Sequence, residues 1–227
     1  MSTVIANTQL IKVARFYEST IGKKAIMAVT GLVLFGFLIA HMLGNLQIFL
    51  GQEVMNHYAE TLHGNPSLLW SARSILIISV VLHIWASVQL SLLKNEARPV
   101  AYVRLTSIQS SWASRTMMLS GPIIAAFVIF HLLHLTTGTL PLPFIPLHAY
   151  ENLVTGFSVI PIAVVYVVVM VVIGFHLSHG VWSMFQSVGF SHPRYTPLIK
   201  KLAPIGSWIL IAGFVSVPIA VLIGLVR

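Results

Sequence analysis

Four histidines lie inside long apolar stretches of this 227-residue sequence, each in a different stretch. They are His41, His83, His131 and His176. An ionisable side chain in a membrane-spanning segment costs free energy unless a partner uses it, so it marks a functional site by default. Neutral imidazole is a common protein ligand for metals, including haem iron. These four side chains therefore predict metal ligation inside a membrane.

The composition indicates the class of protein that holds these side chains. Hydrophobic residues make up 57% of the chain and charged residues only 8%, whereas about a quarter of the residues of a soluble domain are charged. The formal net charge is +8, but the basic residues flank the apolar stretches, where they orient helices rather than bind nucleic acid. The chain has no cysteine, which excludes disulfides and thiolate metal sites.

Five apolar stretches are long enough to cross a bilayer as helices, which takes about 20 residues each. We expect one all-α membrane domain over residues 1–227, with spans at about 24–50, 68–93, 116–137, 159–188 and 204–226. Apolar residues at helical spacing in segment 51–66 predict a short amphipathic helix on the membrane surface. Three prolines between residues 141 and 146 predict an irregular loop before the fourth span.

The positions of the charged residues predict an orientation. With five spans, every lysine and arginine except Arg73 and Arg227 falls on the side of the N-terminus. The positive-inside rule then puts the N-terminus in the cytoplasm. All five glutamates lie in termini or loops and the chain has no aspartate, so the intramembrane carboxylates typical of proton-coupled carriers are missing.

Depth along the helices pairs the four histidines. At about 1.5 Å per residue, His41 and His131 lie roughly 16 to 17 residues from the cytoplasmic ends of their spans, in the outer half. His83 and His176 lie roughly 11 to 13 residues from those ends, in the inner half. Two histidines at one depth on facing helices can bind both axial positions of one haem iron. The pattern predicts two haems stacked across the membrane.

His134 and His179 leave alternatives open, because each follows a proposed ligand by three residues on nearly the same helix face. Either can replace its neighbour as the axial ligand. The four histidines of the third and fourth spans can also be combined into a zinc or copper site, which their different depths disfavour. A single intramembrane histidine can simply hydrogen-bond to a neighbouring helix. We expect His134 and His179 to lie beside a haem or its propionates.

Small residues near the proposed ligands fit the haem prediction. Glycines at these positions let a flat macrocycle approach the backbone, although glycine also lets membrane helices pack closely. They are Gly36, Gly44, Gly121, Gly174 and Gly180.

Three segments resemble the five-helix, two-haem cytochrome b (b558-type) subunits of succinate:quinone oxidoreductases and the related quinol:fumarate reductases. They are Ser19-Thr-Ile-Gly-Lys-Lys24 with Met27-Ala-Val-Thr-Gly31, His41-Met-Leu-Gly-Asn45, and Phe175-His-Leu-Ser-His-Gly-Val-Trp-Ser183. The last is similar to the family's Phe-His-x-Ser-x-Gly-x-Trp-Ser segment, which places the ligand at His176. In the family, the first and third helices hold the outer haem, and the second and fourth hold the inner haem.

The resemblance implies a membrane anchor and electron-transfer subunit in a bacterial cytoplasmic membrane. A flavoprotein subunit would oxidise succinate, or reduce fumarate in the reverse direction. An iron–sulfur subunit would dock on the cytoplasmic face, and this multi-pass chain would connect it through two haems b to a quinone, with menaquinone expected. The family also allows higher oligomers of the complex. The expected partners of the haem propionates are Arg73, Arg115, His134 and Ser183.

One position departs from the family pattern. A fumarate reductase branch carries a glutamate two residues before the fourth-helix ligand and assigns it to a proton route, but this chain has Gly174 there. Such a route is therefore in doubt. Two other functions stay open: a cytochrome b subunit of another dehydrogenase, such as a hydrogenase or formate dehydrogenase, and a haem-free helical scaffold or small-molecule channel. The first predicts a different copurifying enzyme, and the second predicts a colourless protein.

Overall fold

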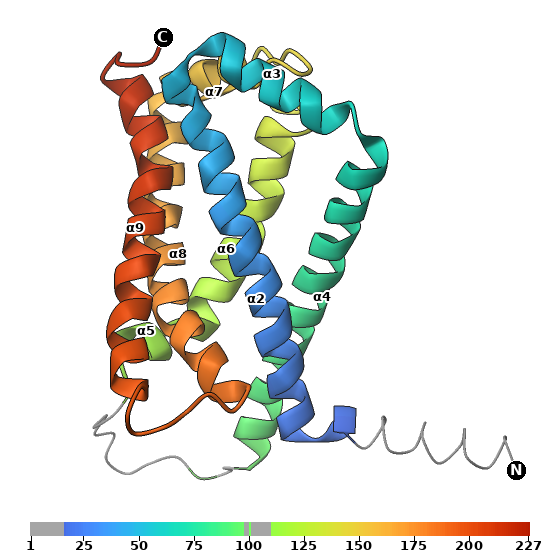
Figure 1. Cartoon of the computed structure of the whole chain (residues 1–227), viewed down its shortest axis with the longest axis vertical. Helices are drawn as coiled ribbons and strands as arrows, with labels where there is room; N and C mark the ends of the chain where they lie inside the picture. Colours follow the sequence, from blue (N-terminus) through green and yellow to red (C-terminus); the bar gives the residue numbers. More distant parts are fainter. Residues whose placement is uncertain (1–15, 98–99, 101–109) are drawn as a thin grey trace, which may run out of the picture.

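The computed structural model describes residues 16–97, 100 and 110–227, and in this part of the chain the regular structure is all helical. Five helices are long and apolar enough to cross a membrane. They are α2 (Thr20–Asn45), α4 (Pro66–Glu96), α6 (Met117–Leu135), α8 (Ile160–Ser187) and α9 (Thr196–Leu222). Successive spans run in opposite directions, so the start of α2 and the end of α9 lie at opposite ends of the bundle (Figure 1). We call these the N-terminal end and the C-terminal end.

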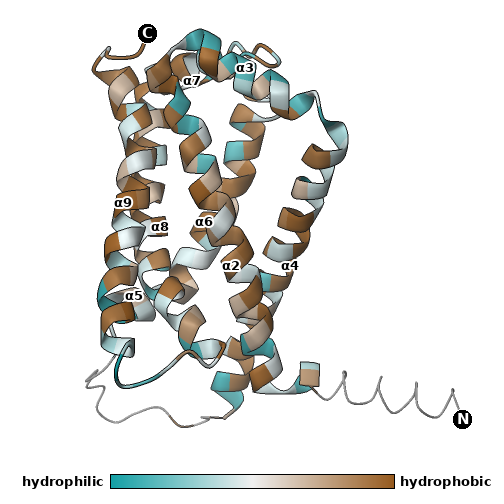
Figure 2. Cartoon of the chain, in the orientation of Figure 1, coloured by the Kyte–Doolittle hydropathy of each residue, from teal (hydrophilic) through white to brown (hydrophobic). Residues whose placement is uncertain are grey.

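Hydropathy follows this arrangement. Hydrophobic residues colour the middle of the five long helices, whereas hydrophilic residues gather towards the helix ends and on the connecting segments (Figure 2). The five apolar helices therefore fit a multi-pass membrane protein.

Local sequence signals explain where several spans begin and end. The Ser19 side chain accepts a hydrogen bond from the Gly22 amide at 3.0 Å and caps α2. The fifth span begins at Thr196 rather than near residue 204, because Pro204 lies inside the helix instead of starting it. Proline is tolerated within membrane helices where neighbouring groups satisfy the freed carbonyl. Gly224, with φ of 73°, follows the end of α9.

Short helices cover the C-terminal end. The 3₁₀ helix η1 (Leu46–Leu50) continues α2 and leads into α3 (Gln52–His63), the amphipathic helix that the sequence predicts. Helix α3 buries Met55 and Ala59 and packs against α7 (Ala149–Ser158), which was not predicted. The proline-containing segment between α6 and α7 is irregular, as expected. At the other end, α5 (Trp112–Arg115) precedes α6.

The spanning helices pack unevenly. Helices α8 and α9 pack along each other, α2 packs against α4, α8 and α9, and α6 packs against α8. Neither α2 with α6 nor α4 with α8 is a closely packed pair in the described structure. The most apolar segments of α8 and α9 are 39% buried inside the chain, against 11% for α2 and α4. The bundle is therefore tight around α8 and α9 and open around α4 and α6.

Candidate functional site

The six histidines of the spans form two groups at different depths. His41 on α2 and His131 on α6 have ring centroids 5.7 Å apart, nearly perpendicular to each other. His83 on α4 and His176 on α8 lie close enough to interact electrostatically. Ser120, which contacts His176, is three turns or about 16 Å along α6 from His131. The structure thus brings His41 and His131 into ring contact and puts His83 and His176 within electrostatic range of each other.

A hydroxyl from the neighbouring helix holds the His83 ring. The Oγ1 of Thr30, a buried residue of α2, lies 3.1 Å from His83 Nδ1 and 2.7 Å from the carbonyl oxygen of Ile26. The hydroxyl has one hydrogen, and the nearby carbonyl can only accept it. With the Thr30 hydrogen on that carbonyl, the Thr30 oxygen can accept a hydrogen bond from His83 Nδ1–H. This tautomer leaves Nε2 with a free lone pair.

His176 is held in the same way by α6. The Oγ of Ser120 lies 2.9 Å from His176 Nδ1 and donates to the Met117 carbonyl at 3.1 Å. Its oxygen can then accept from His176 Nδ1–H, in the tautomer that leaves Nε2 free. Metal-binding histidines commonly use this arrangement, in which a second hydrogen bond fixes the ring and its tautomer. Both hydroxyls therefore lie where they can stabilise the tautomer whose Nε2 is free.

Tyr166 of α8 joins the two histidines of α6. Its Oη lies 3.3 Å from His131 Nδ1 and 2.9 Å from His134 Nδ1. His134 is buried and its ring packs so tightly against Gly156 of α7 that a Cβ at Gly156 would collide with it. The His134 ring therefore faces α7, whereas the His131 ring contacts His41.

Aromatic rings and its own helix surround His41. Its ring stacks on Phe37 at 5.2 Å and contacts Phe214 of α9 at 5.8 Å. The Asn45 amide donates to the His41 backbone carbonyl at 2.7 Å and lies 3.4 Å from both ring nitrogens. Among the described residues, His41 thus has no hydroxyl partner like those of the other three proposed ligands.

The remaining predicted site residues lie around the two pairs without joining one cluster. His179 Nδ1 is buried and has no hydrogen-bond partner in the described structure, and its ring contacts Trp182. Ser183 follows on the same helix near the N-terminal end, where exposed Arg115 ends α5. Arg73 lies near the opposite end, with its guanidinium 5.2 Å from the Trp70 ring centroid.

The predicted glycines divide into two kinds. Gly44 faces Tyr58, and Gly174 packs against Trp208 and Ile211 of α9, so both serve packing. A Cβ at the other three would meet no atom within 4 Å, which leaves space beside the backbone. These are Gly36, Gly121 and Gly180.

A cluster of three or more metal-binding side chains is absent from the described residues. His131 and His134 lie at one depth and His176 and His179 at another, so the structure does not bring the four together. A haem needs only two side chains, because the porphyrin supplies the other iron ligands.

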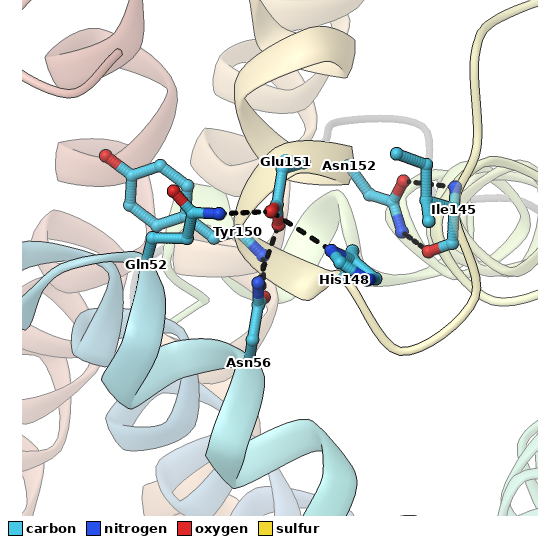
Figure 3. A network of polar contacts seen from close by, with 7 residues as sticks. All are labelled: Gln52, Asn56, Ile145, His148, Tyr150, Glu151 and Asn152. Carbon is cyan, nitrogen blue, oxygen red and sulfur yellow. Dashed lines mark hydrogen bonds and ion pairs between the residues drawn. The ribbon is translucent and has the colours of Figure 1, made fainter.

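A polar network holds α3 against α7 at the C-terminal end (Figure 3). The Glu151 carboxylate accepts hydrogen bonds from Gln52 at 2.6 Å, Asn56 at 2.8 Å and His148 at 3.1 Å. Partial burial by itself raises the pKa of Glu151, but the hydrogen bonds from Asn56 and His148 outweigh this and hold the pKa below its ordinary value. A cavity of about 160 Å³ lies beside Glu151 and Arg227.

Sequence reasoning missed Thr30, Ser120, Tyr166 and Glu151. Thr30 lies within the segment Met27–Gly31 that carries part of the resemblance, and Tyr166 is the sole tyrosine of the fourth span. A hydroxyl inside an apolar stretch was the available signal for the first three. It is a weak signal because such hydroxyls usually bond to their own helix.

Comparison with known proteins finds no matching family model, no matching curated protein and no matching solved structure. The resemblance of the sequence segments to the dihaem cytochromes b therefore stays a prediction.

Proposed function

We propose that this chain is the membrane-anchor and electron-transfer subunit of a succinate:quinone oxidoreductase and binds two haems b. His41 and His131 would bind one iron, and His83 and His176 the other. The observation that supports the proposal is the pair of hydroxyl contacts that can stabilise the tautomers of His83 and His176 in which Nε2 is free. Two histidines that only bridged helices would not both need this tautomer at one depth.

The spacing of the His41–His131 pair fits a shared iron. With metal–nitrogen bonds of about 2 Å, two imidazoles on one iron have ring centroids roughly 6 Å apart. The observed separation is 5.7 Å. A ligand between these rings also suits the packing, because α2 and α6, like α4 and α8, are not closely packed.

The contacts favour one histidine over its neighbour on each helix. His131 contacts the His41 ring, whereas the His134 ring is buried against α7. His176 interacts with His83 and is oriented by Ser120, whereas His179 Nδ1 has no hydrogen-bond partner in the described part of the chain. We therefore keep His131 and His176 as ligands.

Haem b supplies a one-electron iron couple whose potential depends on its axial ligands and their hydrogen bonds. In the proposed complex, electrons pass between the iron–sulfur subunit and a quinone, with menaquinone expected, while the flavoprotein subunit acts on succinate. Arg115, His179 and Ser183 lie towards the N-terminal end and suit the propionates of the His83–His176 haem. Arg73 and His134 lie towards the other end and suit the second haem.

The proposed orientation puts the N-terminal end in the cytoplasm of a bacterial cell. The exposed basic residues among those described at this end would face the docked iron–sulfur subunit, although the positive-inside rule alone accounts for them. They are Lys24, Lys94, Arg115, Arg194, Lys200 and Lys201.

A pyridine haemochrome assay on the purified chain, normalised to protein, tests cofactor binding. We expect about two haems b per chain, and succinate should reduce at least one of them in the native complex. A colourless protein would contradict haem binding. A third outcome is two haems that succinate cannot reduce, in a protein that copurifies with a hydrogenase or formate dehydrogenase. This result would contradict the proposed partner enzyme but not the proposed haem sites.

A further inference from the structure

We propose that Tyr166 is a positioning residue that holds His131 in its ligand form and, together with His134, lowers the potential of the haem bound by His41 and His131. This inference rests on the proposed haem binding and extends it to residues that do not touch the iron. It concerns one of the two haems only.

Tyr166 is placed to act on His131 and His134 and on little else that is polar. The residue is 5% exposed, and the rings of Phe127 and Phe157 lie 4.9 Å from its own ring. Its Oη lies 3.3 Å from His131 Nδ1 and 2.9 Å from His134 Nδ1. A buried phenol needs hydrogen-bond partners, and these two nitrogens supply them.

Because Tyr166 has a single hydroxyl proton, the hydrogen bonds that join His131, Tyr166 and His134 can be arranged in two ways. In the first, His131 Nδ1–H donates to Tyr166 Oη, and Tyr166 Oη–H donates to His134 Nδ1. In the second, both bonds run the other way, and the His131 proton sits on Nε2. Only the first leaves His131 Nε2 free to bind iron. His134 thus acts as the acceptor that keeps the Tyr166 hydroxyl pointing away from His131.

The same contacts act on the potential of the His41–His131 haem. A hydrogen bond accepted from Nδ1–H raises the basicity of a ligand imidazole, and an oxygen that also donates its own proton accepts more strongly. A more basic ligand stabilises ferric over ferrous iron and lowers the potential. Thr30 and Ser120 donate to backbone carbonyls of their own helices, whereas Tyr166 donates to a side chain that can be replaced.

Tyr166→Phe removes this hydroxyl and keeps the aromatic ring. A redox titration of the purified holoprotein, followed by haem absorbance, should show two haems per chain. The affected haem should be the one bound by His41 and His131, which is identified as the haem that His41→Ala lacks. At a fixed ambient potential, its ferrous-to-ferric ratio should rise about tenfold. This corresponds to an upward shift of its midpoint potential by about 59 mV for one electron. The matched control is Tyr150→Phe, which removes a hydroxyl bonded to the Arg227 carbonyl and should shift neither haem.

His134→Leu is the second variant, because Tyr166→Phe can fail to assemble. It keeps the Tyr166 hydroxyl but removes its acceptor, so the same haem should shift upward by a smaller amount. An unchanged potential of this haem in Tyr166→Phe overturns the inference. If Tyr166→Phe does not assemble, an unchanged potential in His134→Leu overturns it instead. Equal shifts of both haems, or an equal shift in Tyr150→Phe, would overturn it too. Wild-type protein without haem would instead contradict the proposed function, so haem content and potential separate the two failures.

Discussion

At the scale of single residues, the proposed ligands differ in how firmly they are held. Three of the four have a hydroxyl from a neighbouring helix beside Nδ1. In the part of the chain that the structure describes, His41 contacts only its own helix and aromatic rings. Helical depth predicts the pairing of the histidines, because depth follows from residue number. It contains no information on which way a side chain points around the helix. For that reason Thr30, Ser120 and Tyr166 could not be found from the sequence.

Replacing one ligand should remove one haem. His41→Ala or His131→Ala should lower the haem content from about two to about one per chain. The remaining haem should be the one bound by His83 and His176, so its spectrum should be missing from His83→Ala and His176→Ala. The physical reason is that each iron depends on its own two imidazoles. The haemochrome assay checks this. Loss of both haems from every variant, in protein that still assembles, would refute the pairing.

Removing the Ser120 hydroxyl should weaken the His83–His176 site. Ser120→Ala leaves His176 Nδ1–H without an acceptor, which costs about 1–3 kcal/mol and loosens the ring. We expect faster transfer of this haem to a haem-scavenging protein, with the other haem unaffected. Ser207→Ala is the matched control, because Ser207 is equally buried but bonds only to the Ala203 carbonyl of its own helix. Equal effects of the two variants would mean that Ser120 has a packing role only.

Replacing His179 should spare both haems. His179 is not the histidine that contacts Ser120, and its Nδ1 has no hydrogen-bond partner in the described residues, so His179→Leu should keep about two haems per chain. Haem content measured beside His176→Leu checks this. If His179→Leu loses the haem and His176→Leu retains it, the ligand on α8 has been assigned to the wrong histidine.

At the scale of elements, the long spans could be predicted and the short helix α7 could not. A run of about 20 apolar residues has few alternatives to a membrane helix, and the amphipathic spacing of α3 was also informative. Helix α7 follows three prolines, and its buried face is recognisable only beside α3. Its stability depends on a contact between segments almost 100 residues apart, such as Gln52 with Glu151, which local pattern does not reveal.

The contact between α3 and α7 should weaken in acid. The pKa of Glu151 is lowered by folding, so its contribution to stability is complete above the unfolded value of about 4.5 and is lost as the pH falls through the lower folded pKa. Hydrogen-exchange protection factors of α3 and α7 should therefore fall at acidic pH, while those of α8 and α9 stay high. Glu151→Gln should make the protection of α3 and α7 low and nearly independent of pH over this range. A fall of equal size in the variant would assign the effect to another group.

At the scale of the whole molecule, the orientation in the membrane can be tested directly because the chain has no cysteine. A single cysteine replaces exposed Ser110 at the N-terminal end or exposed Thr61 on α3 at the other end. With the N-terminus in the cytoplasm, a membrane-impermeant maleimide should label Thr61→Cys in intact cells and Ser110→Cys only after permeabilisation. Labelling in the opposite order would reverse the proposed docking face.

The uneven packing of the bundle also bears on how the protein is made. Helices α8 and α9 bury enough of each other to associate as soon as both have entered the bilayer, since close contact drives the association of membrane helices. Helix α4 packs against α2 and α6 packs against α8, but on the open side neither α4 with α8 nor α2 with α6 is closely packed. Under the proposed function, haem insertion fills these two gaps. Cofactor supply would then decide the last step of biogenesis. A cell short of haem would accumulate a half-assembled chain that membrane proteases can recognise and remove.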